Sequence, residues 1–289
     1  PPRREGPVKA SLGAFFGLIK PRIVLLSCLS SLAGAVASGR TAPWLALAAG
    51  VGLVGAGAAA MNQYQERDSD PLMRRTSGRP IPSGRLSARA ALTISLALSL
   101  AGLSLLLFYC GTASCLLAGL AAFWYNGVYT PLKARSAFSA VIGAVTGAIS
   151  PAIGWAATGR SLLDPTILAL CFFFLVWQVP HSWLLSMRLT AEYEGAGFPT
   201  PLTVFGPLRA GRVLFIWTMT AALAALLLPL YRVVNAPLAV LALAAYAGWT
   251  AFVAARLFLR REEPATMRRV FGVINSLALV VLAATFLGR

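Results

Sequence analysis

Acidic residues are scarce in this sequence: among its 289 residues, nine are Asp or Glu and 25 are Lys or Arg. Charged residues of both signs make up only 12% of the chain, about half the share typical of a soluble domain. Hydrophobic residues make up 58%, and the mean hydropathy is +0.74. These values exclude a soluble globular domain and predict an integral membrane protein.

Histidine and cysteine are also rare. The chain has a single histidine, and its four cysteines form no CxxC pair and no Cys/His spacing typical of a metal site. We interpret the cysteines, which lie in or beside apolar runs, as small buried hydrophobic residues. No basic run alternates with aromatic residues, so we expect no nucleic-acid partner for the net charge of +16. The basic first residues do not precede a short apolar core with a cleavage site, so no cleavable signal peptide is expected.

Apolar runs of about 20 residues, the length that a membrane-crossing helix needs, recur along most of the chain. The alternating segments of roughly ten residues that a membrane β-barrel needs are absent. We therefore predict an all-α integral membrane protein, with residues 1–289 forming one membrane-embedded domain. The nine predicted transmembrane helices are 15–38, 42–64, 88–109, 111–130, 137–158, 163–187, 209–230, 236–258 and 267–287.

The positions of Lys and Arg predict the orientation. If the N-terminus is cytoplasmic, 21 of the 25 basic residues lie on the inner side, in agreement with the positive-inside rule. The four on the outer side are Arg40, Arg160, Arg232 and Arg289. The long polar connections 65–87 and 188–208 are then both cytoplasmic. Loops of this length in a compact fold are usually functional or disordered, so we expect the chemistry at this face.

Residues 62–85, NQYQERDSDPLMRRTSGRPIPSGR, hold three of the nine acidic residues within five positions. Asn62, Glu66 and Asp70 are spaced i, i+4 and i+8, which places them on one helical face, whereas Asp68 points elsewhere. Neighbouring carboxylates raise one another's pKa, and Mg²⁺, which accepts a few carboxylates together with phosphate oxygens, relieves that repulsion. The following arginines suit a diphosphate. The alternative is a solvated loop with internal ion pairs.

A second acidic patch, Glu192 and Glu194, follows the sixth predicted span on the same side. If both patches face a shared polar cavity, they form a site for a metal-bound diphosphate. The alternative for Glu192 and Glu194 is simple exposure to solvent.

His181, the single histidine, lies within the sixth span in VWQVPHSWLLSMR. An ionisable residue inside a membrane is a candidate functional residue. Its functional alternatives are a general base or an axial contact to a haem iron, and its structural alternative is a neutral His bonded to a neighbouring helix. Pro180, which loosens the helix, favours a cavity nearby.

Several segments together carry a resemblance to a known family. The 62–85 segment resembles the first acidic motif of the UbiA-type intramembrane prenyltransferases, and more closely that of the protoheme IX farnesyltransferases, or heme O synthases. The similarity extends, in the same order along the chain, to LIKPRI (18–23), YTPLKAR (129–135), IGAVTGAISPAIGWAATG (142–159), QVPHSW (178–183) and EYEGAGFPTP (192–201).

This resemblance implies nine helices around a central cavity, the UbiA-type prenyltransferase fold. It also implies Mg²⁺-dependent transfer of a farnesyl group from farnesyl diphosphate to the vinyl group of haem b, with hydration, giving heme O and diphosphate for the assembly of haem-copper oxidases. Haem b is then a substrate rather than a cofactor. The implied location is a multi-pass protein among the lipids of the bacterial cytoplasmic (inner) membrane. Formation of a homo-oligomer stays open.

The resemblance also implies roles for individual residues. The metal ligands are Asn62, Glu66, Asp70 and Glu192. The diphosphate-binding residues are Lys20, Arg22, Arg74, Arg75, Arg79, Lys133 and Arg135. The catalytic residues are Asp68, Asp70, Lys133 and His181, and His181 is also the haem-binding residue.

The chain departs from the family pattern at two places. Glu66 stands where the family usually has Asp, and the family's Lys-Asp-Asp-Tyr run is Thr190, Ala191, Glu192 and Tyr193 here, one carboxylate fewer. Two alternative functions are a related prenyltransferase with another acceptor, such as a quinone precursor, a phenol or a chlorophyllide, and a transporter of an anionic lipid or metabolite. Acidic residues at one membrane boundary and the lack of an evident repeat favour an enzyme.

Overall fold

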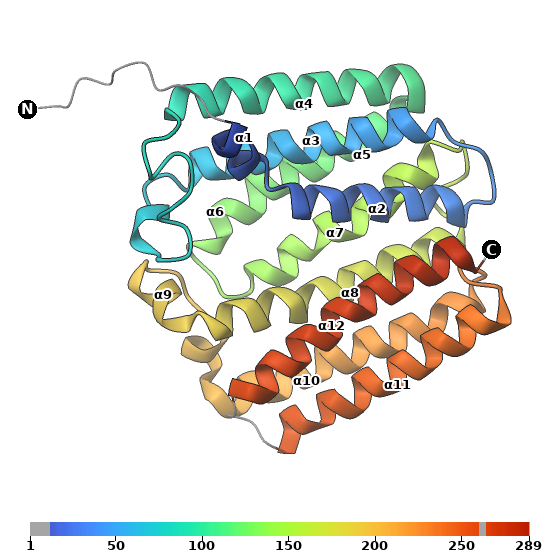
Figure 1. Ribbon diagram of the computed structural model, residues 1–289. Coiled ribbons are helices and arrows are strands. Elements are labelled where there is room, and N and C mark those ends of the chain that lie inside the picture. The colour runs from blue at the N-terminus through green and yellow to red at the C-terminus, as the bar shows by residue number, and fades with distance from the viewer. Residues whose placement is uncertain (1–11, 260–263, 289) are drawn as a thin grey trace, which may run out of the picture.

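The computed structural model describes residues 12–259 and 264–288, and all regular secondary structure in these ranges is helical (Figure 1). The predicted all-α fold class is therefore confirmed. The elements are α1 (Leu12–Ile19), α2 (Pro21–Ala37), α3 (Trp44–Gln65), the 3₁₀-helix η1 (Asp70–Leu72), α4 (Ala88–Cys110), α5 (Thr112–Phe123), the π-helix η2 (Trp124–Tyr129), α6 (Thr130–Lys133), α7 (Ser139–Ala156), α8 (Pro165–Arg188), α9 (Thr190–Gly195), α10 (Pro201–Leu230), α11 (Pro237–Leu259) and α12 (Pro264–Leu287).

The number of spans differs slightly from the nine predicted. Within the described residues, seven helices (α3, α4, α7, α8, α10, α11 and α12) are long and apolar enough to cross a membrane. The bent pair α1 and α2 makes an eighth if it is counted as one span. The remaining predicted span, 111–130, is divided among α5, η2 and α6, because a π-helix interrupts the α-helical bonding there.

The first span is bent by 50° between α1 and α2. Lys20, at the bend, has a left-handed backbone conformation (φ 51°), and Pro21 begins α2. A proline disfavours helical geometry in the residue before it, so the helix cannot run through Lys20. The carbonyls that α1 leaves unpaired are satisfied from α3: Gln63 Nε2 donates to the carbonyls of Gly17 (2.8 Å) and Leu18 (2.9 Å).

The π-helix η2 is explained by Pro131. The Thr130 N–H bonds five residues back, to the Tyr125 carbonyl. The next bond of this kind would require an N–H on Pro131, which proline lacks. The Asn126 carbonyl, which would have accepted it, instead accepts from the side chain Nε2 of Gln65 on α3 (2.9 Å). This contact holds the irregular turn that leads into α6. Such π-helices are frequent at functional sites.

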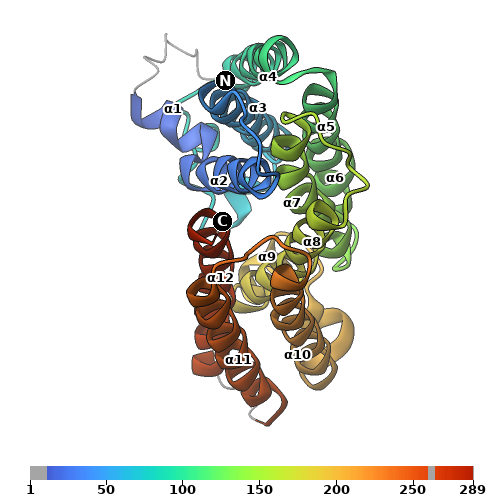
Figure 2. The ribbon, with the colours of Figure 1, turned by 90° about the vertical axis from the view of Figure 1, so that its right-hand side faces the viewer.

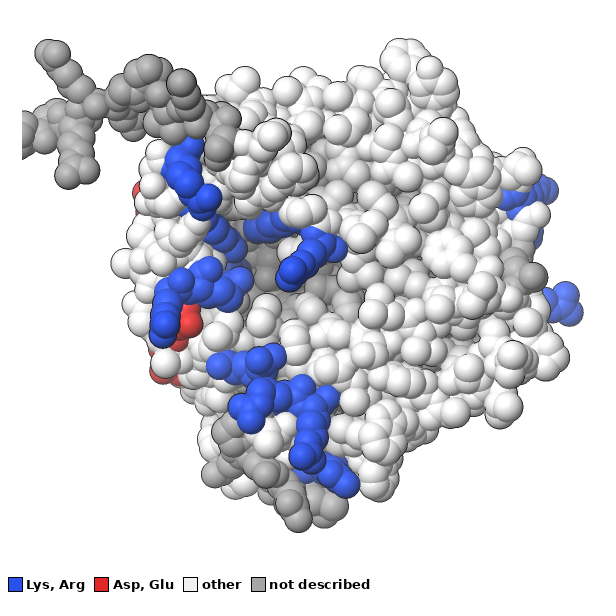
Figure 3. Space-filling model, viewed as in Figure 1, with Lys and Arg blue, Asp and Glu red and all other residues white. Residues whose placement is uncertain are grey.

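Four helices, α2, α7, α8 and α12, contact one another in a closed ring, with α3, α4 and α5 packed on one side and α10 and α11 on the other (Figure 2). In Figure 1, α1, the 65–87 segment, α6 and α9 all lie at one end, while α12 finishes at the other. Most visible Lys and Arg side chains gather at the first end, where the surface is hollowed between them (Figure 3). Both long polar connections therefore lie at the same end of the protein.

Small residues allow α2 and α7 to approach closely. A Cβ atom on Gly34 would lie 1.9 Å from the Pro151 carbonyl oxygen, and one on Gly154 would lie 1.7 Å from the Ser31 carbonyl oxygen. Both obstacles are backbone atoms, which cannot turn aside as a side chain can. Close packing through small residues is a common means of helix association in lipid, where the hydrophobic effect gives little driving force.

Gly154→Ala is therefore expected to lower the free energy of unfolding by about 1 to 3 kcal/mol through overpacking. Thermal unfolding in detergent measures this change. Gly248→Ala in α11 is the matched control, because, apart from its chain neighbours and the backbone of its own helix, no atom lies within 4 Å of the added Cβ. Equal melting temperatures for the two variants would contradict the proposed packing constraint.

Candidate active site

Two carboxylates, Glu66 and Asp70, are buried just past α3, with 6% and 0% of their surface exposed. Although α3 ends at Gln65, the Glu66 N–H donates to the Asn62 carbonyl (2.9 Å), and the Asp70 N–H donates to the Glu66 carbonyl (2.8 Å). This bonding keeps Asn62, Glu66 and Asp70 on one face, as their spacing predicts.

Two cations neutralise these carboxylates, one from the same loop and one from α6. Lys133 Nζ donates to Glu66 Oε1 (2.9 Å), and Arg79 Nη1 donates to Glu66 Oε2 (3.1 Å). The same Arg79 nitrogen lies 2.6 and 2.8 Å from the two oxygens of Asp70. Arg79 reaches back because the loop is folded: Thr76 Oγ1 donates to the Asp70 carbonyl (2.8 Å), and the Arg79 N–H donates to the Thr76 carbonyl (2.9 Å).

These four residues, Glu66, Asp70, Arg79 and Lys133, form a charged cluster. Asn62 joins this cluster to the bend in the first span and to the π-helix. Lys20 Nζ donates to Asn62 Oδ1 (2.7 Å), and Asn62 Nδ2 donates to Thr130 Oγ1 (3.1 Å). The Thr130 hydroxyl in turn donates to the Tyr125 carbonyl (2.9 Å). Sequence reasoning missed Thr130, although it lies in the YTPLKAR segment, three residues before Lys133.

Burial and the nearby cations act in opposite directions on the two carboxyl groups. Burial alone would raise the pKa of Glu66, but Lys133, Lys20 and Arg79 together lower it to about 2. For Asp70, burial outweighs the stabilising contacts from Arg79 and raises the pKa. The sequence predicts that mutual repulsion raises the pKa of both carboxyl groups. At Glu66 the neighbouring cations reverse the direction of that shift, so Glu66 is ionised at neutral pH.

The arrangement of oxygen atoms suits a hard divalent cation. A single nitrogen, Arg79 Nη1, lies within 3.1 Å of Glu66 Oε2 and both oxygens of Asp70, so these oxygens converge on one position for a positive charge. Mg²⁺ needs only one or two carboxylates, with water and phosphate oxygens as further ligands. Within the described part of the chain, no group of three or more His, Cys, Asp or Glu side chains is placed to share a metal ion, and Glu192 instead accepts a hydrogen bond from the Arg75 backbone N–H.

Several sequence-predicted residues lie outside the cluster. The Asp68 side chain is 85% exposed and pairs with Arg67 (3.6 Å), so it points away from the two buried carboxylates, as its spacing predicts. The other predicted residues that are exposed to solvent are Arg22, Arg74, Arg75 and Arg135.

Glu192 connects the two polar segments. Its Oε2 accepts a hydrogen bond from the backbone N–H of Arg75 (2.9 Å). Beside this bond, Met73 packs against Tyr193 and Phe198 in a small apolar cluster. Lys133 Nζ lies 5.6 Å and 4.9 Å from the ring centroids of Tyr193 and Phe198, within range of a cation–π interaction. Glu192 thus holds the 65–87 segment against α9 and the turn that follows it.

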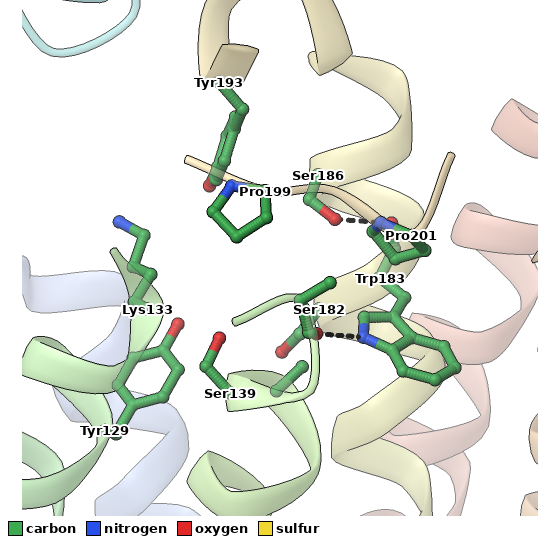
Figure 4. A pocket seen from close by; sticks show the side chains of 11 residues that line it. Tyr129, Lys133, Ser139, Ser182, Trp183, Ser186, Tyr193, Pro199 and Pro201 are labelled. Carbon is green, nitrogen blue, oxygen red and sulfur yellow. Dashed lines mark hydrogen bonds between the residues drawn. The ribbon is translucent and has the colours of Figure 1, made fainter. Parts of the chain in front are cut away.

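A small pocket adjoins Lys133 between α6, α7, α8 and the turn after α9 (Figure 4). Lys133, Tyr129 and Tyr193 lie on one side of it, and two residues of α8, Trp183 and Ser186, lie on the other. Its full lining is Tyr129, Lys133, Ala137, Ser139, Ala140, Ser182, Trp183, Ser186, Tyr193, Pro199 and Pro201. The pocket therefore places apolar and hydroxyl-bearing side chains next to Lys133.

His181 lies apart from the cluster, in a contact between α8 and α12. Its ring stacks between Trp177 (centroids 5.0 Å apart) and Phe271 (5.5 Å), and its Nδ1 lies 2.6 Å from Asn275 Oδ1. The structure thus shows the contact with a neighbouring helix that the structural alternative expects, and this contact leaves the functional alternatives untested. Sequence reasoning missed Asn275, although an amide side chain beside Ser276 in the largely apolar run VINSLALVV is a signal of the same kind as His181.

Comparison with known proteins places the chain among membrane-bound transferases. The model of the UbiA prenyltransferase family matches residues 24–282. The chain is 40% identical over 217 residues to the protoheme IX farnesyltransferase of Geobacter sulfurreducens. The alignment covers 74% of this chain and 80% of that protein. It is 35% identical over 274 residues to the protein of the same name from Paracoccus denitrificans, covering 90% and 85% of the two chains.

Solved structures share the fold at low sequence identity. A digeranylgeranylglyceryl phosphate synthase has a TM-score of 0.78 at 17% identity, covering 96% of this chain and 98% of the other. A UbiA homologue from Archaeoglobus fulgidus, bound to GPP and Mg²⁺, has a TM-score of 0.65 at 19% identity, covering 95% and 98%. These structures confirm the predicted fold family.

The pKa of Glu66 leads to a prediction about acid stability. A carboxyl whose pKa falls from 4.5 to about 2 on folding stabilises the protein above pH 4.5, by on the order of 3 kcal/mol, and loses that contribution as the pH falls toward 2. Glu66→Gln should therefore lower the melting temperature most at pH 7, and the deficit should shrink below pH 4.5. The control is Glu194→Gln, at an exposed carboxylate. A Glu66→Gln deficit that is the same at pH 7 and pH 3 would contradict the assignment.

The contact of Glu192 gives a second prediction. Glu192→Ala should free the 65–87 segment and make its exposed arginines, Arg74 and Arg75, more susceptible to trypsin. Glu192→Gln should behave like the native protein, because an amide oxygen still accepts from the Arg75 N–H. If the Gln and Ala variants are cleaved equally fast, Glu192 does not act through this hydrogen bond.

Proposed function

The chain belongs to the UbiA prenyltransferase family, and we propose that it transfers a farnesyl group from farnesyl diphosphate to the vinyl group of haem b, giving heme O and diphosphate. The observation that carries the acceptor is the similarity to protoheme IX farnesyltransferases over most of their length. The cationic cluster around Glu66 and Asp70 supports the diphosphate half of the reaction.

The diphosphate is bound by three partly buried cations at the cluster, Lys20, Arg79 and Lys133. They come from three separate segments: Arg79 and Lys133 contact the two carboxylates, and Lys20 contacts Asn62. Charge-assisted hydrogen bonds to phosphate oxygens are among the strongest in proteins. The exposed Arg22, Arg74, Arg75 and Arg135 attract the anionic substrate to this end of the protein.

Asn62, Glu66 and Asp70 are the proposed ligands of Mg²⁺, and the convergence of carboxylate oxygens on Arg79 Nη1 supports this set. When bound, Mg²⁺ supplies positive charge against the charge that develops on the leaving diphosphate. Arg79, no longer needed to neutralise the carboxylates, is then free to donate to the diphosphate. Glu192 as a further ligand stays a prediction from the family motif, as does a catalytic role for Asp68.

The reaction breaks the bond between farnesyl C1 and oxygen, and the electron pair leaves with the diphosphate. The terminal vinyl carbon of haem bonds to C1, water adds to the other vinyl carbon, and one proton is released. Lys133 and Arg79 hold the leaving group, because preorganised positive charge is most effective where negative charge develops. The apolar helices keep stray water from the allylic cation.

His181 is the proposed haem-side residue. It precedes Arg188, the last residue of α8, by seven positions, which corresponds to about 10 Å along a helix. The acceptor is thus bound deeper in the membrane than the charged end of the protein. We take the chain as one catalytic domain whose segments 65–87 and 188–208 face the cytoplasm across a bacterial inner membrane. The basic residues at that end and the bacterial relatives support this orientation.

Incubation of the purified protein with farnesyl diphosphate, Mg²⁺ and haem b tests the proposal, with mass spectrometry to detect hydroxyfarnesylated haem. Omission of Mg²⁺ should abolish the product. A folded preparation that binds haem yet forms no product would refute the acceptor assignment. Farnesylation of an added phenol instead would identify a related prenyltransferase.

The two neighbouring aspartates should respond differently to the same substitution. Asp70→Asn is expected to lower kcat by about two to three orders of magnitude, because it removes a buried charge from the cluster. The 85% exposure of the Asp68 side chain favours a rate within a few-fold of the native one for Asp68→Asn, and such a rate would refute the catalytic role that the family motif predicts for it. Steady-state rates of both variants test these expectations, and melting temperatures establish that both variants are folded. A native rate for Asp70→Asn would refute the metal assignment.

A further inference from the structure

The side chain of His181 is fixed by groups from two helices. On one face it stacks on Trp177 of its own helix α8, and on the other on Phe271 of α12, with interplanar angles of 29° and 28°. Trp177 is itself tied to α12, because its Nε1 donates to the Ile274 carbonyl (2.7 Å). The plane of the imidazole is therefore set from both sides, and only rotation within that plane and the position of its proton remain to be determined.

Asn275 determines which ring nitrogen of His181 carries the proton. Its Nδ2 donates to the Phe271 carbonyl (2.7 Å), an oxygen that can only accept. The other amide atom, Oδ1, must therefore be the one that faces His181 Nδ1, at 2.6 Å. Because Oδ1 can only accept, Nδ1 must carry the hydrogen. In a neutral imidazole, the hydrogen on Nδ1 leaves Nε2 with a free lone pair.

No described residue forms a hydrogen bond to His181 Nε2, and the side chain is partly exposed. We propose that Asn275 is a positioning residue: it locks His181 as the Nδ1–H tautomer and so presents Nε2 as the electron-pair donor to the iron of the haem substrate. The inference rests on the proposed function for the identity of the acceptor. The tautomer itself follows from the hydrogen bonds alone. Hydrogen bonds to the second ring nitrogen are the usual means by which proteins orient a ligating histidine.

Because His181 is the only histidine in the chain, ¹⁵N-histidine labelling reports on this residue alone, provided that the purification tag contains no histidine. The native protein at pH 8 should show Nδ1 protonated and Nε2 unprotonated. Asn275→Leu, which removes the acceptor, should give a mixture of tautomers, whereas Asn275→Asp, which retains an acceptor oxygen, should restore the native pattern. The matched control is Thr285→Val, which removes another buried side chain of α12 that bonds only within its own helix.

Haem b titration followed by absorption spectroscopy tests the role of Nε2. Asn275→Leu should bind haem about 10- to 100-fold more weakly, with the Soret band displaced, as expected when the partner of a metal ligand is lost. His181→Ala should lose the histidine-ligated spectrum, and Asn275→Asp and Thr285→Val should keep it.

Three results would overturn the proposal: a proton on Nε2 in the native protein, an unchanged tautomer in Asn275→Leu, or native haem affinity in Asn275→Leu after its tautomer has changed. In all three cases, formation of hydroxyfarnesylated haem by the native protein would leave the proposed function intact. Failure of the folded native protein to bind haem would instead refute the acceptor assignment, and with it the role of Nε2 toward iron.

Discussion

Neutralisation of two buried carboxylates is the constraint on which the polar end of this protein depends. Glu66 and Asp70 are almost fully removed from solvent, and an isolated charge in that position would be strongly destabilising. Each therefore requires a cation, and the structure supplies one from the same 65–87 segment and one from α6, 67 residues from Glu66. Arg79 serves both carboxylates, and Lys133 serves Glu66 from α6. A ligand that carries positive charge can replace some of these contacts without leaving either carboxylate unpaired.

The irregular parts of the backbone deliver these cations. The bend between α1 and α2 directs Lys20 to Asn62, and the π-helix before Pro131 brings Thr130 and Lys133 to α3. Each irregularity is stabilised by a glutamine of α3, since Gln63 satisfies the end of α1 and Gln65 satisfies η2. The helix α3 thus supplies Asn62 to the cluster and also the supports of the segments that meet it.

The two halves of the proposed reaction take place in chemically different surroundings. In the proposed reaction, the leaving diphosphate lies with Lys20, Arg79 and Lys133 at the charged end of the bundle. The proposed haem site is formed by aromatic rings and by His181, which Asn275 holds between α8 and α12. The pocket beside Lys133, bounded by Tyr129 and Trp183, lies between α6 and α8 and so adjoins elements of both halves. This separation matches the substrates, one strongly anionic and the other largely apolar.

The sequence alone determined the membrane class, the positions of the apolar spans and the shared face of Asn62, Glu66 and Asp70, because lipid requires long apolar helices and helical spacing is local. The count of nine spans was less accurate, since Pro131 creates a π-helix whose effect depends on a partner in α3. Only the tertiary structure decided which cation meets which carboxylate, because Lys133 is 67 residues from Glu66. It also decided that Asn275 meets His181, 94 residues away. Contacts between such distant residues depend on how helices pack, and the spacing of residues along one chain does not encode that.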